Sequence, residues 1–533
     1  MDNFLWWRDG VIYQVYPRSF CDSDQDGLGD IPGITSRLDY LVELGVDAIW
    51  LSPFFPTPDK DFGYDVSNYC DVDPRFGTLA DFDRLLTVAH QRGIHIILDM
   101  VMNHTSDQHP WFAESRSDRL NPKRDWYIWR DSPNNWEASF GGKAWTWDPT
   151  SRQYFLHLFT PSQPDLNWRN PEVYQAVLSV FRLWLERGVD GFRLDVFNAY
   201  FKDASFRDNP PRFGLRGFDR QVHIHDIDQP EMFPLLKDLR SLLDSYPERY
   251  SVGETYLSTP SKAASYSGPG KLHSAFSFDF TSPDSTLAVL LGTSPLDPSY
   301  IRKQILLRDL AFDAAGVYPT LVMSNHDLRR AASRYSHGEE DARPRLALAL
   351  LLTLRGTPFL YYGEEIGMRE LSLKHHEIMD PLGRKYWPLF HGRDGCRSPM
   401  QWDSSPHAGF STVSPWLKVH PDYLQRNVAR QRLDPDSLFS FTRDLIALRR
   451  KTPALQHGDF TPLQDTPSSV LAFLRRSGDQ DILVALNFSR RKVSFSHPDF
   501  SGQLLFSSVR DETRDFRSGI SLLPFEVCIL SRD

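Results

Sequence analysis

Short apolar runs alternate along the chain with segments in which apolar residues recur every three or four positions. The runs have the length of buried strands, and the segments between them have the period of amphipathic helices. Such an alternation predicts a parallel sheet with helices packed across it. The strand-like runs are residues 11–17, 46–53, 94–101, 189–196, 250–256, 273–280, 318–325 and 357–362.

Helical periodicity follows these runs and completes the repeat. The helix-like segments are residues 34–45, 79–92, 172–187, 230–243, 300–315, 343–355 and 438–450. Eight strands in alternation with these seven helix-like segments predict an α/β protein with a closed (β/α)8 TIM barrel. An open doubly wound sheet is the alternative, and acidic residues at several strand ends favour the barrel.

Two stretches interrupt the alternation. Between residues 105 and 169, after the third strand, Trp, Pro, Asn, Asp and Gly dominate, which indicates an inserted lobe rather than a linker. From residue 455 to 533 the chain changes to short alternating runs, typical of an antiparallel β domain. We therefore expect a barrel domain from residues 1–104 and 170–454, a lobe from 105–169 and a C-terminal domain from 455–533.

Three carboxylates each end a strand-like run. They are Asp195 in Gly-Phe-Arg-Leu-Asp-Val, Glu254 in Val-Gly-Glu-Thr-Tyr and Asp327 in Ser-Asn-His-Asp. The carboxyl ends of the strands of a parallel barrel meet at one mouth, where such barrels hold their chemistry. Two acids placed there can act as nucleophile and general acid on a glycosidic bond.

The residue types around these acids suit different roles. Arg193 and Asp195 are two apart on a strand and face the same side, so the fixed guanidinium charge is expected to keep Asp195 ionised as a nucleophile. Glu254 must begin protonated to donate to the leaving oxygen and then return as base. Asp327, beside His326, can hold sugar hydroxyls as the ring flattens.

Composition and charge narrow the possible partners. The 533 residues carry a formal net charge of −9, which argues against nucleic acid or an anionic membrane surface and favours a neutral substrate. The four cysteines show neither metal-ligand spacing nor a disulfide pattern. The N-terminal residues show no basic n-region followed by an apolar h-region, and no stretch approaches the ~18 apolar residues of a membrane span. We therefore expect a cytoplasmic protein.

An acidic loop follows the first strand. Asp22, Asp24, Asp26 and Asp30 surround Gly27, an arrangement that can place oxygen ligands around a hard cation. An EF-hand would need Glu at its twelfth position, which here is Gly33, so that interpretation fails. So many protein oxygens favour Ca²⁺, in a structural role, over Mg²⁺. A solvated turn without metal is the alternative.

Several motifs in a fixed order resemble the α-amylase superfamily, glycoside hydrolase family 13, and within it the α-glucosidase and oligo-1,6-glucosidase branch. Besides the three acid motifs they include Val-Ile-Tyr-Gln-Val-Tyr-Pro-Arg-Ser-Phe at 11–20, Asp-Met-Val-Met-Asn-His at 99–104, Gln-Pro-Asp-Leu-Asn-Trp at 163–168 and Gly-Arg-Asp-Gly-Cys-Arg-Ser-Pro-Met-Gln-Trp-Asp at 392–403. The resemblance implies that Asp195 is the nucleophile, Glu254 the acid/base and Asp327 the transition-state stabiliser.

The same resemblance implies the residues that bind the substrate and the metal. Those expected to bind the terminal glucose and its neighbour are Asp61, Tyr64, His104, Arg193, His326, Arg393 and Arg397. Asp61 and Arg393 would clamp the far hydroxyls and so close the pocket, which implies exo-action. The implied metal ligands are Asp22, Asp24, Asp26, the Leu28 carbonyl and Asp30.

The function expected from these residues is retaining, exo-acting hydrolysis of short α-glucosides. One alternative is an α-glucosyltransferase or sugar isomerase, because a sugar can replace water as the acceptor on the same glucosyl-enzyme. A catalytically silent scaffold is disfavoured, because all three acids are present. The linkage stays open, since Val196 and 163–167 resemble α-1,6-specific enzymes whereas 223–230 resembles broader α-glucosidases. The oligomeric state also stays open.

Overall fold

The structure is a computed structural model that describes residues 4–257, 259–278, 298–336, 341–496, 501–509, 515–517 and 519–532. The chain forms two compact units. Unit 1 comprises Met1–Trp50, Val88–Ile94 and Phe276–Asp533, and unit 2 comprises Leu51–Thr87 and His95–Ala275. None of the helices in the described ranges combines the length and hydropathy of a membrane span.

The strands of unit 1 run parallel in the order β10-β11-β1-β2. They are β1 (Ile12–Val15), β2 (Ala48–Leu51), β10 (Thr320–Val322) and β11 (Thr357–Tyr361). All their residues are buried, so each strand is mostly apolar rather than alternating, and the polar Gln14, Thr320 and Thr357 are buried with the rest. The helices of this unit that precede or follow them in the chain are α2 (Ile31–Ser36), α3 (Leu38–Leu44), α10 (Pro298–Ala315), α11 (Ala331–Tyr335), α12 (Ala342–Thr353) and α15 (Leu438–Lys451).

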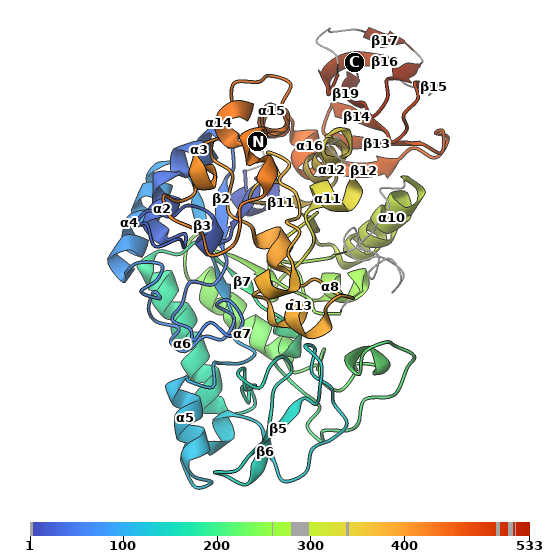
Figure 1. The fold of residues 1–533 in the computed structure, drawn as a ribbon. Coiled ribbons are helices and arrows are strands. Elements are labelled where there is room, and N and C mark those ends of the chain that lie inside the picture. Colours follow the sequence, from blue (N-terminus) through green and yellow to red (C-terminus); the bar gives the residue numbers. More distant parts are fainter. Residues whose placement is uncertain are drawn as a thin grey trace. The chain divides into compact units, whose positions relative to one another are not determined.

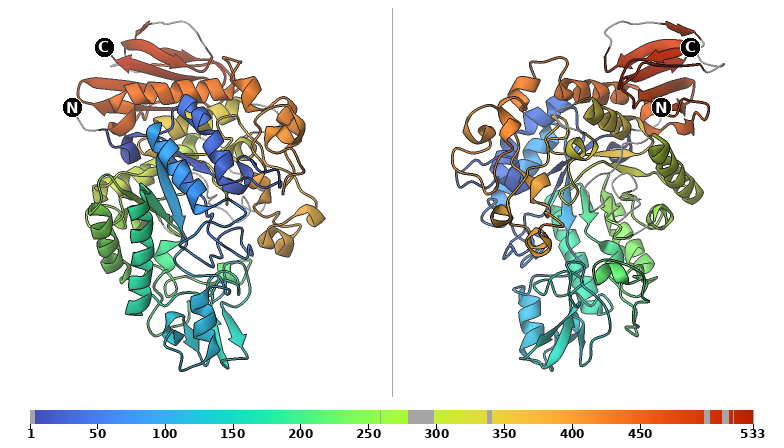
Figure 2. Two further views of the ribbon diagram at one scale, coloured as in Figure 1. Left: turned by 90° about the vertical axis from the view of Figure 1, so that its left-hand side faces the viewer. Right: turned by 45° about the vertical axis from the view of Figure 1, so that its right-hand side comes forward.

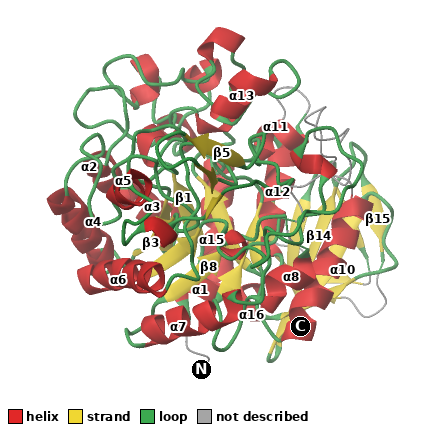
Figure 3. Ribbon diagram, turned by 90° about the horizontal axis from the view of Figure 1, so that it is seen from below, coloured by secondary structure: helices red, strands yellow, loops and turns green. Residues whose placement is uncertain are grey.

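Unit 2 contributes parallel strands in the order β3-β7-β8-β9. They are β3 (His95–Met100), β7 (Gly191–Leu194), β8 (Tyr250–Gly253) and β9 (Ser274–Ala275). Figure 3 shows α6 (Pro171–Arg187) and α7 (Met232–Asp244) outside these strands. Phe181 of α6 meets Phe192 of β7 with ring centroids 5.0 Å apart, so the apolar face of the helix covers the sheet.

Four parallel strands from each unit, each followed by a helix, make up the eight repeats of a (β/α)8 TIM barrel. The predicted fold class is confirmed, and the doubly wound alternative is set aside. The remaining helices are α1 (Trp6–Asp9), α4 (Leu79–Gln91), α8 (Pro260–Ser265), α13 (Pro381–Tyr386), α14 (Val428–Gln431) and α16 (Pro453–His457).

Several predicted boundaries differ from the structure. The segment 34–45 forms two helices rather than one, because Arg37 leaves the helical region with φ −107° and ψ 8°. The helix after β8, α8, had no predicted range, since it is only six residues long. The predicted strand 273–280 is reduced to β9, and residues 279 and 280 lie outside the described ranges.

The inserted segment contains a three-stranded sheet and a helix. The strands β4 (Trp129–Arg130), β5 (Trp145–Asp148) and β6 (Gln153–Leu156) pair in the order β4-β6-β5. Figure 2 shows α5 (Pro110–Ser117) in the same cyan part of the chain. Sequence periodicity did not predict α5 because only two of its residues are buried, one of them Phe112, which packs on Trp129 and Phe155.

The C-terminal residues form antiparallel sheets, as predicted (Figure 1). The larger has the order β12-β13-β14-β19-β16-β17 and the smaller pairs β15 with β18. The strands are β12 (Asp459–Pro462), β13 (Val470–Ser477), β14 (Gln480–Asn487), β15 (Val493–Phe495), β16 (Ser501–Ser507), β17 (Asp515–Arg517), β18 (Ile520–Leu522) and β19 (Val527–Arg532). The three-domain division with the boundaries given above stays a prediction.

Two buried arginines, one on the C-terminal sheet and one on the helix α15, donate to the end of the barrel helix α12. Arg475 of β13 donates to the carbonyl oxygens of Thr353 at 2.6 Å and of Gly458 at 3.0 Å. Arg449 of α15 donates to the carbonyl oxygen of Leu352 at 3.1 Å. Leu352 and Thr353 end α12, where carbonyl groups lack helical partners and a positive charge is favourable.

Arg475→Met should therefore destabilise the protein by about 1–3 kcal/mol, because it leaves buried carbonyl oxygens without donors. Thermal or urea unfolding measures the change. Arg476→Met is the matched control, since the Arg476 side chain is 43% exposed and pairs with Asp481 at the surface. Equal loss of stability in the two variants would contradict the role of Arg475.

Candidate active site

One buried guanidinium in unit 2 contacts three carboxylates. Arg193 of β7 lies opposite Asp99 of β3 in the strand register, and its Nη1 is 2.6 Å from Oδ1 of Asp99. The same Nη1 is 2.6 Å from Oδ1 of Asp195, and Nη2 is 2.6 Å from Oε2 of Glu254. The predicted nucleophile and acid/base are thus held side by side at the ends of adjacent strands β7 and β8.

The turns after these strands have unusual backbone geometry. Val196, directly after Asp195, is in the left-handed region with φ +36°, where a β-branched residue is strained. Its amide nitrogen lies 3.3 Å from Oε2 of Glu254 and donates to it. Gly253 precedes Glu254, and a Cβ there would lie 2.3 Å from the ring of Phe197. The close packing of the two turns therefore requires glycine at position 253.

Burial changes the electrostatics that the sequence suggested for Asp195. Burial raises the pKa of the Asp195 carboxyl well above its usual range, although Arg193 acts in the expected direction and lowers it. The expectation that the Arg193 charge dominates this pKa is wrong, because desolvation is the larger effect. Burial also raises the pKa of Asp99 to about 6. The carboxylates around Arg193, in contrast, outweigh its own burial and raise its pKa well above the usual range.

Three predicted sugar-binding residues adjoin this cluster. The Tyr64 hydroxyl donates to Oδ2 of Asp99 at 3.0 Å, and Nε2 of His104 is 2.9 Å from the Tyr64 carbonyl oxygen. Nε2 of Gln163 is 3.1 Å from Oδ2 of Asp61 and 3.2 Å from Nε2 of His104. Burial lowers the pKa of His104 to about 4, so its imidazole is neutral at pH 7. Unit 2 thus brings Asp61, Tyr64, His104, Arg193, Asp195 and Glu254 together.

A buried lysine behind His104 was missed by the sequence analysis. Nζ of Lys202 lies 2.8 Å from Oδ2 of Asp165 and 2.8 Å from Oδ1 of Asn103, and both side chains of the ion pair are fully buried. Asn103 in turn donates to Oδ1 of Asp165 at 3.1 Å. The available signal was a lysine that directly follows the apolar run Ala199–Tyr200–Phe201.

Unit 1 holds a second constellation around Asp327, after β10. Oδ1 of Asp327 accepts from Nη2 of Arg397 at 2.8 Å and from Nη1 of Arg393 at 3.2 Å. Nε2 of His326 is 3.3 Å from Oδ2 of Asp327, and its Nδ1 is 2.8 Å from Nε2 of Gln14. Arg397 also donates to the His326 carbonyl oxygen at 2.7 Å. The four predicted residues of this unit are therefore adjacent.

Asp380, a residue that the sequence analysis missed, anchors Arg393. Its Oδ1 accepts from Nη2 of Arg393 at 2.8 Å, and its Oδ2 accepts from the Arg393 amide at 2.9 Å. Burial would raise the pKa of Asp380, but the Arg393 guanidinium outweighs it, and the pKa lies below its usual range. An ionised Asp380 holds the guanidinium beside Asp327. No local pattern marked Asp380, because its partner is 13 residues away.

The acidic loop in unit 1 gathers three of its predicted ligands. Among the described residues, ligand oxygens of Asp22, Asp24 and Asp30 lie within 4.8 Å of one another. Asp26 is outside that group and accepts from the Leu28 amide at 2.7 Å. Burial raises the pKa of Asp30 and of Asp24. Three carboxylates are a donor set that suits a hard cation.

Comparisons with known proteins agree with this fold. Residues 14–458 match the family model for the alpha amylase catalytic domain, and residues 460–513 match that for the maltogenic amylase C-terminal domain. A probable alpha-glucosidase of Rhizobium meliloti is 46% identical over 91% of this chain and 89% of its own. An oligo-1,6-glucosidase of Parageobacillus thermoglucosidasius is 36% identical over 98% of both chains.

Solved structures give the same result. An alpha-glucosyl transfer enzyme has a TM-score of 0.93 and 42% identity, with all of both chains covered. The trehalulose synthase of Pseudomonas mesoacidophila MX-45 has a TM-score of 0.90 and 34% identity, with 99% of both chains covered.

The fold and the acids at its strand ends define a barrel of the glycoside hydrolase class. The chain belongs to the α-amylase family, glycoside hydrolase family 13, as its motifs predicted.

The Lys202–Asp165 pair yields a stability prediction. Lys202→Met should destabilise unit 2 by about 3–5 kcal/mol, because it leaves the Asp165 carboxylate buried without its cation. The double variant Lys202→Met/Asp165→Asn should recover part of that loss, since both charges are then absent. Unfolding of the two variants by urea provides the measurement. A double variant less stable than Lys202→Met would show that the charge of Asp165 is not what makes the single substitution costly.

Proposed function

We propose that this protein is a retaining, exo-acting α-glucosidase that removes terminal glucose from short α-glucosides. The observation that carries the proposal is the contact of one guanidinium, that of Arg193, with both Asp195 and Glu254. Retaining enzymes need two carboxyl groups about 5–5.5 Å apart, and a shared guanidinium holds two carboxyl groups close together. The named activities of the relatives support the same reaction.

In this mechanism Asp195 attacks the anomeric carbon while Glu254 protonates the departing glycosidic oxygen. The C–O bond to the leaving group breaks, and a glucosyl ester forms on Asp195. Glu254, now ionised, removes a proton from water, which attacks the ester and releases glucose with retained configuration. Arg193 balances the negative charge that passes between the two carboxyl groups.

Asp327 is proposed to hold sugar hydroxyls while the ring approaches an oxocarbenium ion. The support is its side chain, which is flanked by Arg393, Arg397 and His326 and is still 35% exposed, so a substrate can reach it. Asp61, Tyr64 and His104 are proposed to bind the terminal glucose. The Asp61–Arg393 clamp, a contact of Arg397 with the acceptor sugar, the linkage preference and the cytoplasmic location stay predictions.

Asp195→Asn and Glu254→Gln should each lower hydrolysis of p-nitrophenyl α-glucoside by at least about 10³-fold, because each removes the charge or the proton that its step requires. Released nitrophenolate measures the rate. Asp238→Asn on α7, an exposed carboxylate that accepts from Tyr174, is the matched control and should keep full activity. Azide should restore turnover to Asp195→Ala as β-glucosyl azide. Retention of more than a few per cent of activity in either variant would contradict the assignment.

Transfer of glucose to a second sugar is the alternative reaction. The specific observation in its favour is the likeness to an alpha-glucosyl transfer enzyme at 42% identity over the full chain. The two reactions share the glucosyl-enzyme and differ in whether water or a sugar attacks it. Incubation with isomaltose, maltose, sucrose, trehalose, kojibiose and nigerose, with glucose and transfer products quantified separately, decides between them.

We also propose that the acidic loop binds a structural Ca²⁺ ion. Asp22, Asp24 and Asp30 would supply carboxylate oxygens, and the Leu28 carbonyl and Asp26 would complete the set. Support comes from the convergence of the three carboxylates. Mg²⁺ is less suitable, because it keeps most of its water ligands. The ion would join the start of α2, whose N-cap is Asp30, to the preceding loop.

Chelation should accordingly lower thermal stability more than activity. A bound ion at about 100 times its Kd contributes about 2.7 kcal/mol, and a chelator removes this contribution. Differential scanning calorimetry with and without EDTA, in metal-free buffer, measures the difference. Asp24→Asn should abolish the effect of the chelator, since this exposed side chain supports little else. Identical melting temperatures with and without EDTA would remove the metal from the proposal.

A further inference from the structure

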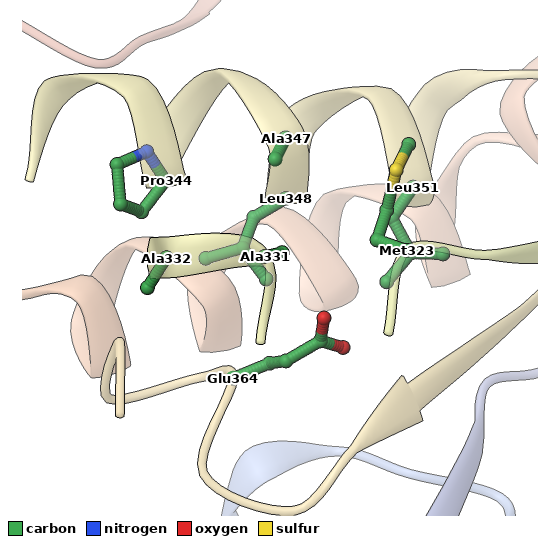
Figure 4. Close-up of a pocket in the computed structure, with 8 residues that line it drawn as sticks. All are labelled: Met323, Ala331, Ala332, Pro344, Ala347, Leu348, Leu351 and Glu364. Carbon is green, nitrogen blue, oxygen red and sulfur yellow. The ribbon is translucent and has the colours of Figure 1, made fainter. Parts of the chain in front are cut away.

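A second buried carboxyl group, Glu364, lies behind the Asp327 constellation in unit 1. It follows β11 after Tyr362 and Gly363, and it is 6% exposed. Figure 4 shows its side chain directed into a cavity lined by Met323 and by apolar residues of α11 and α12. The cavity volume of about 10 Å³ is too small for an organic ligand. The buried position of Glu364 is therefore explained by its contacts within the protein and not by a bound organic ligand.

Those contacts link the ends of two neighbouring strands. The Ser324 hydroxyl donates to Oε1 of Glu364, and the Tyr361 amide donates to Oε2 at 2.9 Å. Ser324 lies just after β10, three residues before Asp327. The turn continues with the Asp327 amide donating to Oδ1 of Asn325 at 2.8 Å. Glu364 thus contacts the first residue of the turn, residues 324–327, that carries Asp327.

The charged groups facing Glu364 come from the segment that precedes and forms α11. Arg330 donates to the Tyr362 carbonyl oxygen at 2.8 Å, and Arg334 donates to the Met323 carbonyl oxygen. Glu370 accepts from the Arg330 amide at 2.9 Å. The α12 residues that line the cavity are uncharged. Arg330 and Arg334 therefore have two effects. Their positive charges favour an ionised Glu364, and their hydrogen bonds fix the backbone at the ends of the neighbouring strands.

We propose that Glu364 is a positioning residue for Asp327: by accepting from Ser324 it fixes the 324–327 turn and holds the Asp327 carboxylate between Arg393 and Arg397. This inference rests on the proposed role of Asp327 in glucoside hydrolysis. Asp327 acts through hydrogen bonds that strengthen in the transition state, so a displaced carboxylate should lower kcat more than it changes KM.

Kinetics of four variants test the proposal. Glu364→Met removes both acceptor oxygens and keeps the length of the side chain. Its kcat on p-nitrophenyl α-glucoside should fall about tenfold, which is the effect of one lost hydrogen bond to a charged group. Its KM should change by less than about twofold. Ser324→Ala should lower kcat similarly, and the double variant should be no worse than Glu364→Met, because both remove the same link. Glu364→Gln can donate to the Ser324 oxygen and accept from the Tyr361 amide, so it should keep most of kcat.

Glu365→Met is the matched control. Glu365 is the adjacent buried carboxyl group, and it accepts from the hydroxyls of Tyr13 and Tyr40 rather than from the 324–327 turn. It should lose thermal stability as Glu364→Met does but keep kcat. Equal loss of kcat in Glu365→Met, wild-type kcat in Ser324→Ala, or additive effects in the double variant would each overturn the proposal. Because Ser324→Ala decides by itself, the test survives if Glu364→Met does not fold.

The pH dependence of stability gives a readout independent of activity. Burial raises the pKa of Glu364 from its ordinary 4.5 to about 7. Between these pH values the folded protein holds a proton that the unfolded chain has lost, so this group stabilises the fold less as pH rises from about 5 to 7. The melting temperature of Glu364→Gln minus that of wild type should therefore increase over this range. A constant difference would overturn the buried placement on which the proposal depends.

The two proposals fail in different ways. If the wild-type protein does not hydrolyse p-nitrophenyl α-glucoside, the proposed function falls, and the pH-dependent stability of Glu364→Gln still tests the placement of Glu364. If the wild type is active and Glu364→Met has its kcat, the positioning role falls and the proposed function stands.

Discussion

The contact of Arg193 with Asp99, Asp195 and Glu254 is the interaction on which the rest of this structure depends. One guanidinium cannot neutralise three carboxylates, so burial leaves Asp195 and Asp99 with raised pKa values. Their spacing depends on the register of β3, β7 and β8, because a slip of one residue would turn every side chain of a strand to the opposite face. The register is therefore a requirement of the chemistry as well as of the core.

In unit 1 the charges are arranged in the opposite way, with one carboxylate between two guanidinium groups. Asp327 is one carboxylate shared by two arginines, and Asp380 fixes one of them from behind. A buried ion pair contributes little net stability, since desolvation offsets the attraction, but it defines geometry well. Asp380 and Glu364 are both buried and both contact residues next to the proposed chemistry. Their contacts are better explained by positioning than by stability.

The relatives indicate which bond is cleaved, that of an α-glucoside, more clearly than they indicate which acceptor, water or a sugar, receives the glucosyl group. Glucosidases and a glucosyl transfer enzyme match this chain over nearly its whole length. Both reactions require the same nucleophile and acid, so shared acids cannot distinguish them. Which of the two prevails depends on how groups beyond the acids admit water or a second sugar. The segment after β7 contains both Val196, which resembles α-1,6-specific enzymes, and residues 223–230, which resemble broader α-glucosidases. Product analysis would therefore be most informative about the role of this segment.

The sequence by itself determined the strand–helix alternation, the antiparallel C-terminal strands, the family and the acids at the strand ends, because periodicity and short motifs are local properties. Only the tertiary structure revealed the charged pairs that surround those acids, such as Asp99 with Arg193, Asp380 with Arg393 and Lys202 with Asp165. These contacts join residues whose separation along the chain carries no local pattern. The direction of the Asp195 pKa also required the fold, since desolvation depends on every neighbour that excludes water, whereas the opposing Arg193 charge is visible two residues away in the sequence.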